Sequence, residues 1–394
     1  MKKTLFIFFL FLLCGNYLSA QGSLIEPNDS TPTLLQRITK NEWSVPTAHM
    51  NLQFYTSGAA YLTEGKLDEA AFKLNRVRLE ILGTFGQQFS YHFRQSFNKY
   101  SNPYSLDNLS SSVEFAYVKW DMSKKFALTV GKQVMALGGY EFYVNAIKVR
   151  EFSDFNNNIS CYQAGVTGTI HFSPTQELNL QILNNRSGGD EDTYLFGLPE
   201  GVEKTKVPVL ATANWNGLFL EEALELRYAA SWGQLAKKRN LYYLTAGNIV
   251  KTGPVTAYVD VMYSREGIDS KGLLSNLTAP GTYTPVTAQY ATYFTTIGNL
   301  DYRIHPNWNV YVKGAYETFG IYQSNGYFDK GIYCRTWNAQ ACVEYFPMRN
   351  SELLIFLHFL YKGNALASYG KAVGAVLPDR QRISLGLVYS IPVF

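Results

Sequence analysis

Apolar and polar side chains alternate with a period of two along most of the chain beyond residue 48. In residues 89–97, Phe89, Tyr91 and Phe93 fall on one face of an extended segment and polar residues fall on the other. The same pattern recurs in residues 255–263, 290–304 and 383–393. A period of two over such lengths is the signal of a β-strand with one apolar and one polar face.

This alternation, followed through the chain, predicts sixteen strands. Their expected spans are 49–58, 70–83, 88–97, 112–122, 125–134, 161–173, 176–186, 206–216, 221–233, 240–251, 254–265, 288–305, 307–318, 332–346, 351–362 and 380–394. A tilted strand of about ten residues crosses roughly 25 Å of hydrocarbon. The strands therefore have the length that a transmembrane barrel needs.

The connections between these strands also alternate. Every second one is expected to be a tight turn, at 83–88, 123–124, 173–176, 217–219, 252–253, 305–306 and 347–350. Those between are mostly long, at 59–69, 98–111, 135–160, 187–205, 266–287, 319–331 and 363–379, and only 234–239 is short. Short turns on one rim and long loops on the other are typical of outer-membrane barrels.

These patterns predict an all-β fold, a closed antiparallel transmembrane barrel of about 16 strands. Closure follows from the cost of leaving backbone groups unpaired in lipid. A barrel of this size is wide enough for an aqueous channel. With an even number of strands, both termini are expected on the short-turn, periplasmic side.

The first twenty residues have the layout of a cleaved secretory signal. Lys2 and Lys3 precede the apolar run 5–13, and the segment ends at Ala20. We expect residues 21–48 to form a short periplasmic arm and residues 49–394 to form the barrel. The predicted location is the outer membrane of a Gram-negative cell.

Composition agrees with this reading. Aromatic residues make up 15% of the chain and charged residues only 17%, against about 25% charged in soluble domains. No apolar run after the signal reaches the roughly 18 residues of a membrane helix. Without Lys2 and Lys3 the net charge of +4 falls to +2, which gives no electrostatic reason to expect nucleic acid as a partner.

Candidate chemistry is sparse. The cysteines beyond the signal, Cys161, Cys334 and Cys342, are widely spaced and expected to be free or buried thiols. The histidines lack metal-ligand spacing, and no nucleophile elbow, phosphate loop or dinucleotide motif occurs. We therefore expect no metal, no cofactor and no enzymatic activity.

Several short segments resemble a known family. They are Gly131–Gln133, Gly138–Glu141, Glu151–Phe155, Ser160–Gly165, Arg76–Gly83, Phe89–Asn98 and Ala211–Gly217. Together they are similar to the phosphate-selective porin O and P family in its Bacteroidetes branch. The resemblance implies a 16-stranded barrel, a homotrimer, and a third external loop, here about 135–160, that folds into the lumen. Phosphate-selective members have dense lysine and arginine in the channel, whereas the bases of this chain are scattered.

If the apolar face of each strand meets lipid, the opposite face lines the channel. Candidate channel-lining and anion-selecting bases are Arg76, Arg78, Arg94, Lys132, Lys148, Arg150, Arg303, Lys313 and Arg382. Fixed charges at a constriction set ion preference, but Glu151 and Asp154 beside these bases favour a mixed-charge constriction with weak selectivity. The predicted function is passive diffusion of small polar solutes or ions, with a possible preference for anions or phosphate. The alternative is a surface receptor or adhesin that binds through its long loops.

Overall fold

The computed structural model describes residues 47–99, 106–186, 188–189, 193–278, 285–348 and 351–393. In this part of the chain sixteen strands are formed: β1 Thr47–Thr63, β2 Lys66–Phe85, β3 Phe89–Ser96, β4 Val113–Ser123, β5 Phe126–Val134, β6 Tyr162–Ser173, β7 Gln176–Asn184, β8 Val209–Phe219, β9 Leu224–Ala236, β10 Arg239–Thr252, β11 Val255–Ile268, β12 Gln289–His305, β13 Trp308–Ile321, β14 Gly331–Tyr345, β15 Leu354–Leu366 and β16 Arg380–Pro392. Short helices lie in the loops: η1 Ala146–Lys148, α3 Asp154–Asn157, α5 Leu273–Thr278 and α6 Ser368–Ala372. The expected signal and most of the expected arm lie outside the described residues.

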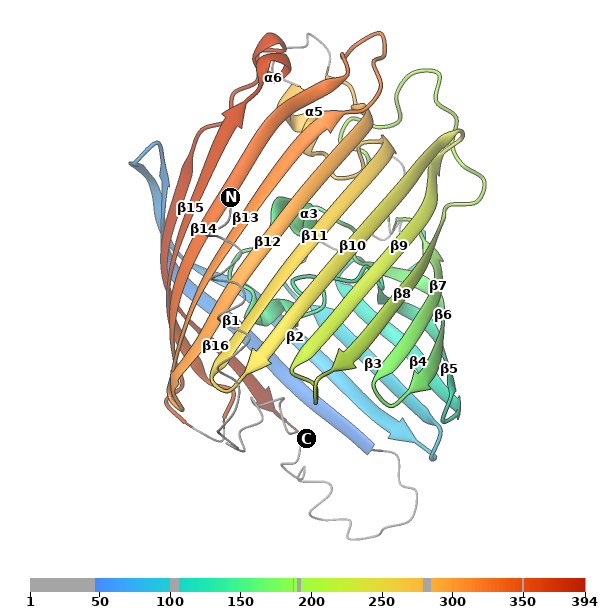
Figure 1. The fold of residues 1–394 in the computed structure, drawn as a ribbon, viewed down its shortest axis with the longest axis vertical. Coiled ribbons are helices and arrows are strands. Elements are labelled where there is room, and N and C mark those ends of the chain that lie inside the picture. The colour runs from blue at the N-terminus through green and yellow to red at the C-terminus, as the bar shows by residue number, and fades with distance from the viewer. Residues whose placement is uncertain are drawn as a thin grey trace, which may run out of the picture. The chain divides into compact units, whose positions relative to one another are not determined.

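The strands form one closed antiparallel barrel, as predicted (Figure 1). Each strand pairs with its neighbours in the sequence, and β1 closes the sheet on β16, with Asn51 opposite Pro392 and Thr63 opposite Arg380. Closure leaves the sheet without a free edge in the hydrocarbon layer. The first strand begins at Thr47, two residues before the expected start of the barrel.

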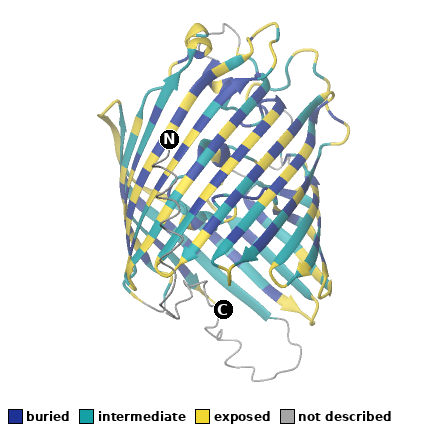
Figure 2. Cartoon of the chain, in the orientation of Figure 1, coloured by how far each residue is buried: buried dark blue, intermediate teal, exposed yellow. Residues whose placement is uncertain are grey.

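Burial alternates along the strands, which appear banded in Figure 2. In β14, for example, Thr336, Asn338 and Gln340 are buried on the inner face, whereas Trp337 and Val343 are exposed on the outer face. The inner face is polar and the outer face is apolar, opposite to the order in a soluble protein. This is the arrangement required when lipid surrounds the sheet and water is inside.

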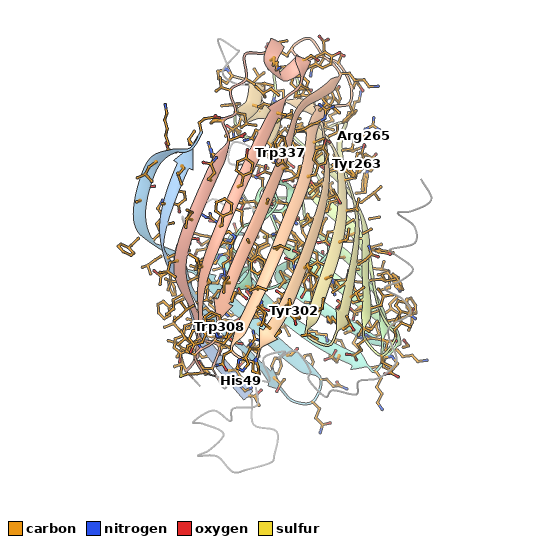
Figure 3. The ribbon with its side chains drawn as sticks, turned by 60° about the vertical axis from the view of Figure 1, so that its left-hand side comes forward. His49, Tyr263, Arg265, Tyr302, Trp308 and Trp337 are labelled. Carbon is orange, nitrogen blue, oxygen red and sulfur yellow. The ribbon has the colours of Figure 1, made fainter. Side chains whose placement is uncertain are left out.

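Aromatic side chains gather near the two ends of the outer wall. Tyr263 and Trp337 lie toward the long-loop rim, and Tyr302 and Trp308 lie toward the short-turn rim (Figure 3). Rings with a polar edge favour the two interfaces of a membrane, so these residues mark the borders of the apolar belt. None of the helices in the described part of the chain is long and apolar enough to cross a membrane.

One expected loop is replaced by strand. Residues 59–69 were expected to form a long connection, but β1 and β2 continue and are joined only by Glu64 and Gly65. Both residues have positive φ, 51° and 75°, as in the two-residue turns that match the twist of a hairpin. β3 pairs with β2 only from Arg78 onward, so the hairpin extends beyond its neighbour in Figure 1.

The long loops turn inward and pack against the wall strands. Phe155, Tyr194, Leu274, Phe328 and Ala375 belong to one buried apolar cluster together with side chains from β9 to β14. The loops therefore fill part of the long-loop half of the barrel and narrow the passage through it.

Candidate functional site: the inward loop and its charges

The third long connection, residues 135–161, is named L3 here. It begins after Val134, the last residue of β5, which stands opposite Tyr162 of β6. Three residues earlier, Gly131 stands opposite Gly165. Gly131 has φ +126°, and a Cβ there would lie 2.3 Å from the Ala116 carbonyl oxygen. Only glycine can adopt this conformation at such a close approach.

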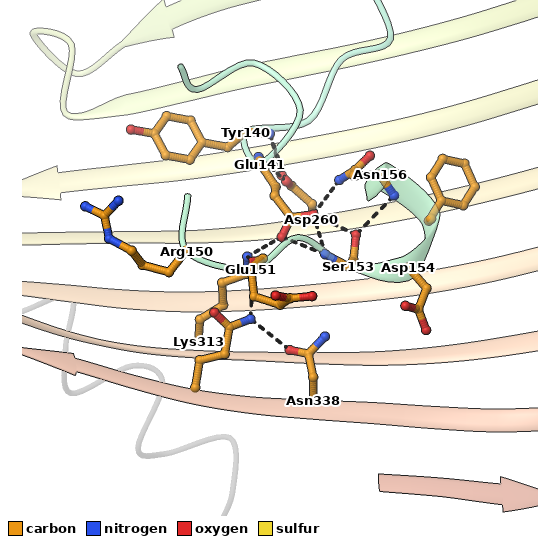
Figure 4. A network of polar contacts seen from close by, with 12 residues as sticks. Tyr140, Glu141, Arg150, Glu151, Ser153, Asp154, Asn156, Asp260, Lys313 and Asn338 are labelled. Carbon is orange, nitrogen blue, oxygen red and sulfur yellow. Dashed lines mark hydrogen bonds and ion pairs between the residues drawn. The ribbon is translucent and has the colours of Figure 1, made fainter. Parts of the chain in front are cut away.

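The first anchor of L3 is Asp260 on β11. Its carboxylate accepts hydrogen bonds from the backbone N–H groups of Tyr140 and Glu141, each at 2.8 Å (Figure 4). Gly139 packs directly against Gly247 of β10. A Cβ added at Gly247 would lie only 2.6 Å from the Cα of Gly139. The loop is thus held by its backbone, at a place where side chains would not fit.

The second anchor is Glu141, which is fully buried. It forms an ion pair with Lys313 of β13. It also accepts hydrogen bonds from the Ser153 hydroxyl at 2.6 Å and the Asn156 amide at 2.5 Å. Charge-assisted bonds of this kind are stronger than neutral ones, so Glu141 joins the two arms of L3 to the barrel wall.

The third anchor holds the short helix α3. Glu317 of β13 accepts hydrogen bonds from the N–H groups of Asp154 at 2.8 Å and Phe155 at 3.0 Å. The side chain of Asp154 reaches the other way and pairs with Lys362 of β15 at 2.5 Å. Two residues of the barrel wall, Glu317 and Lys362, therefore hold the single turn of α3, one through its backbone and one through its Asp154 side chain.

The segment of L3 just before α3 contacts β14, β15 and β16. Arg150 pairs with Glu344 at 3.3 Å and stacks over the Phe356 ring at 4.4 Å. Glu151 pairs with Arg382 at 2.9 Å. L3 is inserted between β5 and β6 and contacts wall strands from β9 to β16.

Other predicted bases are neutralised on the wall itself. Arg78 and Arg94 pair with the fully buried Glu114 at 3.1 and 2.8 Å. Lys132 is buried and pairs with Asp107, in the loop before β4, at 2.9 Å. These three cations act within internal ion pairs and do not present an isolated charge to the lumen.

Three of the predicted bases, Lys148, Arg76 and Arg303, have no carboxylate partner among the described residues. Lys148, at the end of η1, is exposed, and Arg76 is partly buried with its guanidinium 5.9 Å from the Phe152 ring. Among the described residues no carboxylate lies within 4 Å of either group. Arg303 lies near the short-turn rim, stacked on Phe346 at 3.8 Å and donating to the Pro306 carbonyl oxygen at 2.7 Å, and no described carboxylate lies within 4 Å of it.

The acidic partners were not identified from sequence. Asp260, Glu317, Glu344 and Glu114 all hold L3 or a channel base, and Arg227, stacked at 3.4 Å on Tyr143 of L3, is a further wall cation. Asp260 could have been found, because it takes an inward position in the alternating segment 255–263. The pairings themselves could not, since they join residues as far apart as Glu151 and Arg382.

The described residues contain no group of His, Cys, Asp and Glu that could hold a metal ion. Cys161, Cys334 and Cys342 are free thiols, as expected. What the geometry offers is a polar passage, narrowed by a firmly anchored loop, through a barrel with an apolar belt. This defines an outer-membrane channel.

Comparison with known families agrees with that class. The model of the phosphate-selective porin O and P family matches residues 50–391, and the chain belongs to this family. The family and the fold are those of a channel rather than an enzyme, and the function is passive diffusion of small solutes across the outer membrane. Comparison with the curated proteins found no match.

Solved structures share the fold at low identity. The outer membrane channel DcaP of Acinetobacter baumannii is 12% identical, with 89% of this chain and 99% of that chain covered and a TM-score of 0.61. An anion-selective porin from Comamonas acidovorans is 8% identical, with 88% and 100% covered and a TM-score of 0.57. The trimer form of OmpT from Vibrio cholerae is 10% identical, with 88% and 100% covered and a TM-score of 0.53.

Proposed function

We propose that the channel prefers anions, and that the preference is modest. The observation that carries this proposal is the charge pairing of L3. Its three carboxylates, on Glu141, Glu151 and Asp154, are matched by Lys313, Arg382 and Lys362. On or beside L3, Lys148 and Arg76 then remain as bases without a carboxylate partner in the described part of the chain. Arg303 has none either, but it lies near the short-turn rim, away from L3.

Fixed charge matters most where the passage is narrow. A constricting loop whose own acids are paired, with unpaired bases beside it, contributes a positive potential, which raises the local concentration of anions. The wall carboxylates Asp260 and Glu317 reduce this potential, because they accept backbone N–H groups of L3 and have no cation within 4 Å among the described residues. Because only two bases of this kind, Lys148 and Arg76, lie on or beside L3 among the described residues, the selectivity is weak and falls as salt screens it. The anion-selective porin from Comamonas acidovorans shows that the same fold can support this preference.

We further propose that the long loops face the exterior, that both termini are periplasmic, and that the protein assembles as a homotrimer. The OmpT structure in its trimer form supports the last point. We place the contact between subunits on the β1–β2 hairpin of this chain. Phe72 is 94% exposed there, beside Leu67 and Leu74, and exposed apolar patches mark contact sites.

The test is the reversal potential of the purified channel in a planar bilayer under a potassium chloride gradient. The current through the wild-type channel should reverse at a potential of the sign expected for an anion-selective pore. Lys148→Glu should move the potential toward the cation side, and Arg76→Gln should move it less. Lys124→Glu, on the exposed turn between β4 and β5, is the matched control and should change nothing. A cation-selective wild type, or variants that all reverse alike, would refute the proposal.

A further inference from the structure

The outer wall has a groove over strands β7 to β11. The groove has a volume of about 760 Å³ and is lined mainly by apolar side chains. This volume is within the range of small-molecule sites. The groove faces the lipid rather than the lumen, so the channel function does not explain it.

The register of the strands shows how the groove is built. Two outward rows cross the wall, Ile182–Ala211–Trp232–Tyr242–Arg265 and Leu180–Ala213–Ala230–Leu244–Tyr263. Ala211 is the second residue of the first row, and Ala213 and Ala230 are the second and third residues of the other row. These three neighbouring alanines form a floor between the taller side chains Ile182 and Leu180 on one side and Trp232 and Leu244 on the other.

One end of the groove is cationic. Arg265 lies about ten residues along β11 from Val255, which corresponds to about 24 Å along the barrel axis at a 45° tilt. That is one hydrocarbon thickness, and it puts Arg265 at the membrane interface on the long-loop side, next to Tyr263 in Figure 3. Arg265 is exposed and stacks on Tyr322 at 4.0 Å.

A second arginine lies beside the first. Arg239 stacks on Tyr290 at 4.9 Å, and Tyr290 contacts Tyr322 at 5.5 Å, so two guanidinium groups flank a pair of rings. No carboxylate of the described chain lies within 4 Å of either group. Lys238 is exposed in the adjoining turn between β9 and β10, the short connection on this rim.

We propose that this groove is a binding site for a phosphorylated, multiply acylated glycolipid of the outer leaflet. One acyl chain lies on the alanine floor, and a phosphate is bound by Arg265 and Arg239, whose planar donors suit phosphate oxygens. Basic groups at the border of an apolar wall are the usual recognition element for anionic lipid headgroups. The proposal depends on the proposed orientation, in which the long loops face the exterior.

The experiment is native mass spectrometry of the purified full chain in detergent, with diphosphorylated hexa-acyl lipid A added. The wild type should retain one lipid A per chain. Arg265→Gln should lower retention about tenfold, because a charge-assisted contact is lost. Ala213→Phe should lower it similarly by filling the floor. Arg335→Gln and Ala339→Phe, outward-facing positions on β14, are matched controls and should retain lipid like the wild type.

Each other outcome has a defined meaning. Equal retention by all five proteins would overturn the site. Preferential retention of phosphatidylglycerol, lost in the same two variants, would overturn the choice of glycolipid and the orientation with it. Loss of trimers in Ala213→Phe with lipid retention unchanged would assign the groove to a second copy of the chain. Conductance and reversal potential, measured on the same samples, should be unchanged, which separates this test from that of anion preference.

Discussion

Replacing Lys313 by methionine keeps most of the side chain's length but removes the cation that faces Glu141. Lys313 is buried, pairs with Glu141 and donates to the Glu151 carbonyl oxygen at 2.6 Å. The variant leaves the Glu141 carboxylate buried without its cation. We expect L3 to leave the wall more often, and the barrel itself to remain closed.

The size of the effect follows from the burial of the pair. Breaking a buried ion pair by removing one partner costs about 3–5 kcal/mol. We take the lower end, about 3 kcal/mol, because Glu141 keeps its donors on Ser153 and Asn156. At about 1.4 kcal/mol for each factor of ten, the population of detached L3 should rise roughly 100-fold.

Single-channel recording measures this population directly. The Lys313→Met channel should show frequent excursions to a higher conductance level, absent or rare in the wild type. Lys251→Met is the matched control, since Lys251 pairs with Glu225 at 3.3 Å but is 39% exposed. Exposed pairs contribute about 0–1 kcal/mol. If the two variants show the same steady current as the wild type, L3 is not held by this ion pair and the reasoning fails.

Two more predictions concern the β1–β2 hairpin and Tyr140 of L3. Phe72→Ser should reduce the trimer fraction in size-exclusion chromatography with light scattering while the monomer keeps its heat-dependent gel shift; an unchanged trimer fraction would remove the β1–β2 hairpin from the interface. Tyr140 lies in L3, where burial, reinforced by acidic neighbours such as Glu225, raises its pKa to about 12. Because the folded pKa exceeds the usual value of 10, the stabilisation by this neutral phenol is fully present below pH 10 and is lost as the pH rises through 12. The difference in absorbance at 295 nm between the wild type and Tyr140→Phe should therefore titrate near pH 12, and a midpoint near 10 would contradict the burial.

The sequence was informative about the barrel wall because lipid imposes a regular pattern. Each strand must present apolar side chains to one side, as Val259, Val261 and Tyr263 do on β11. That requirement predicts the number and order of strands. The alternation of apolar and polar side chains is weaker where the sheet extends beyond the hydrocarbon layer of the membrane. The first part of β2 has Lys66, Asp68 and Glu69 among its residues, and so it was read as a loop although it pairs with β1.

The lumen obeys no such pattern, and there the sequence was less informative. The inward loop was expected at about 135–160, and L3 occupies 135–161. Its partners depend on the closure of the barrel, which brings Asp154 to Lys362 and Glu151 to Arg382. A base on an inward position can be predicted, but whether an acid cancels it cannot. This is why Lys148 and Arg76 could not be separated in advance from bases such as Arg78 and Lys313.

The central claim is that water and ions pass through the barrel beside an anchored L3. The most direct measurement is the current–voltage relation of single molecules of the purified protein in symmetric potassium chloride. The account predicts stepwise insertions and a linear relation through the origin for the wild type. Correctly folded barrels that insert into the bilayer and pass no current would contradict it.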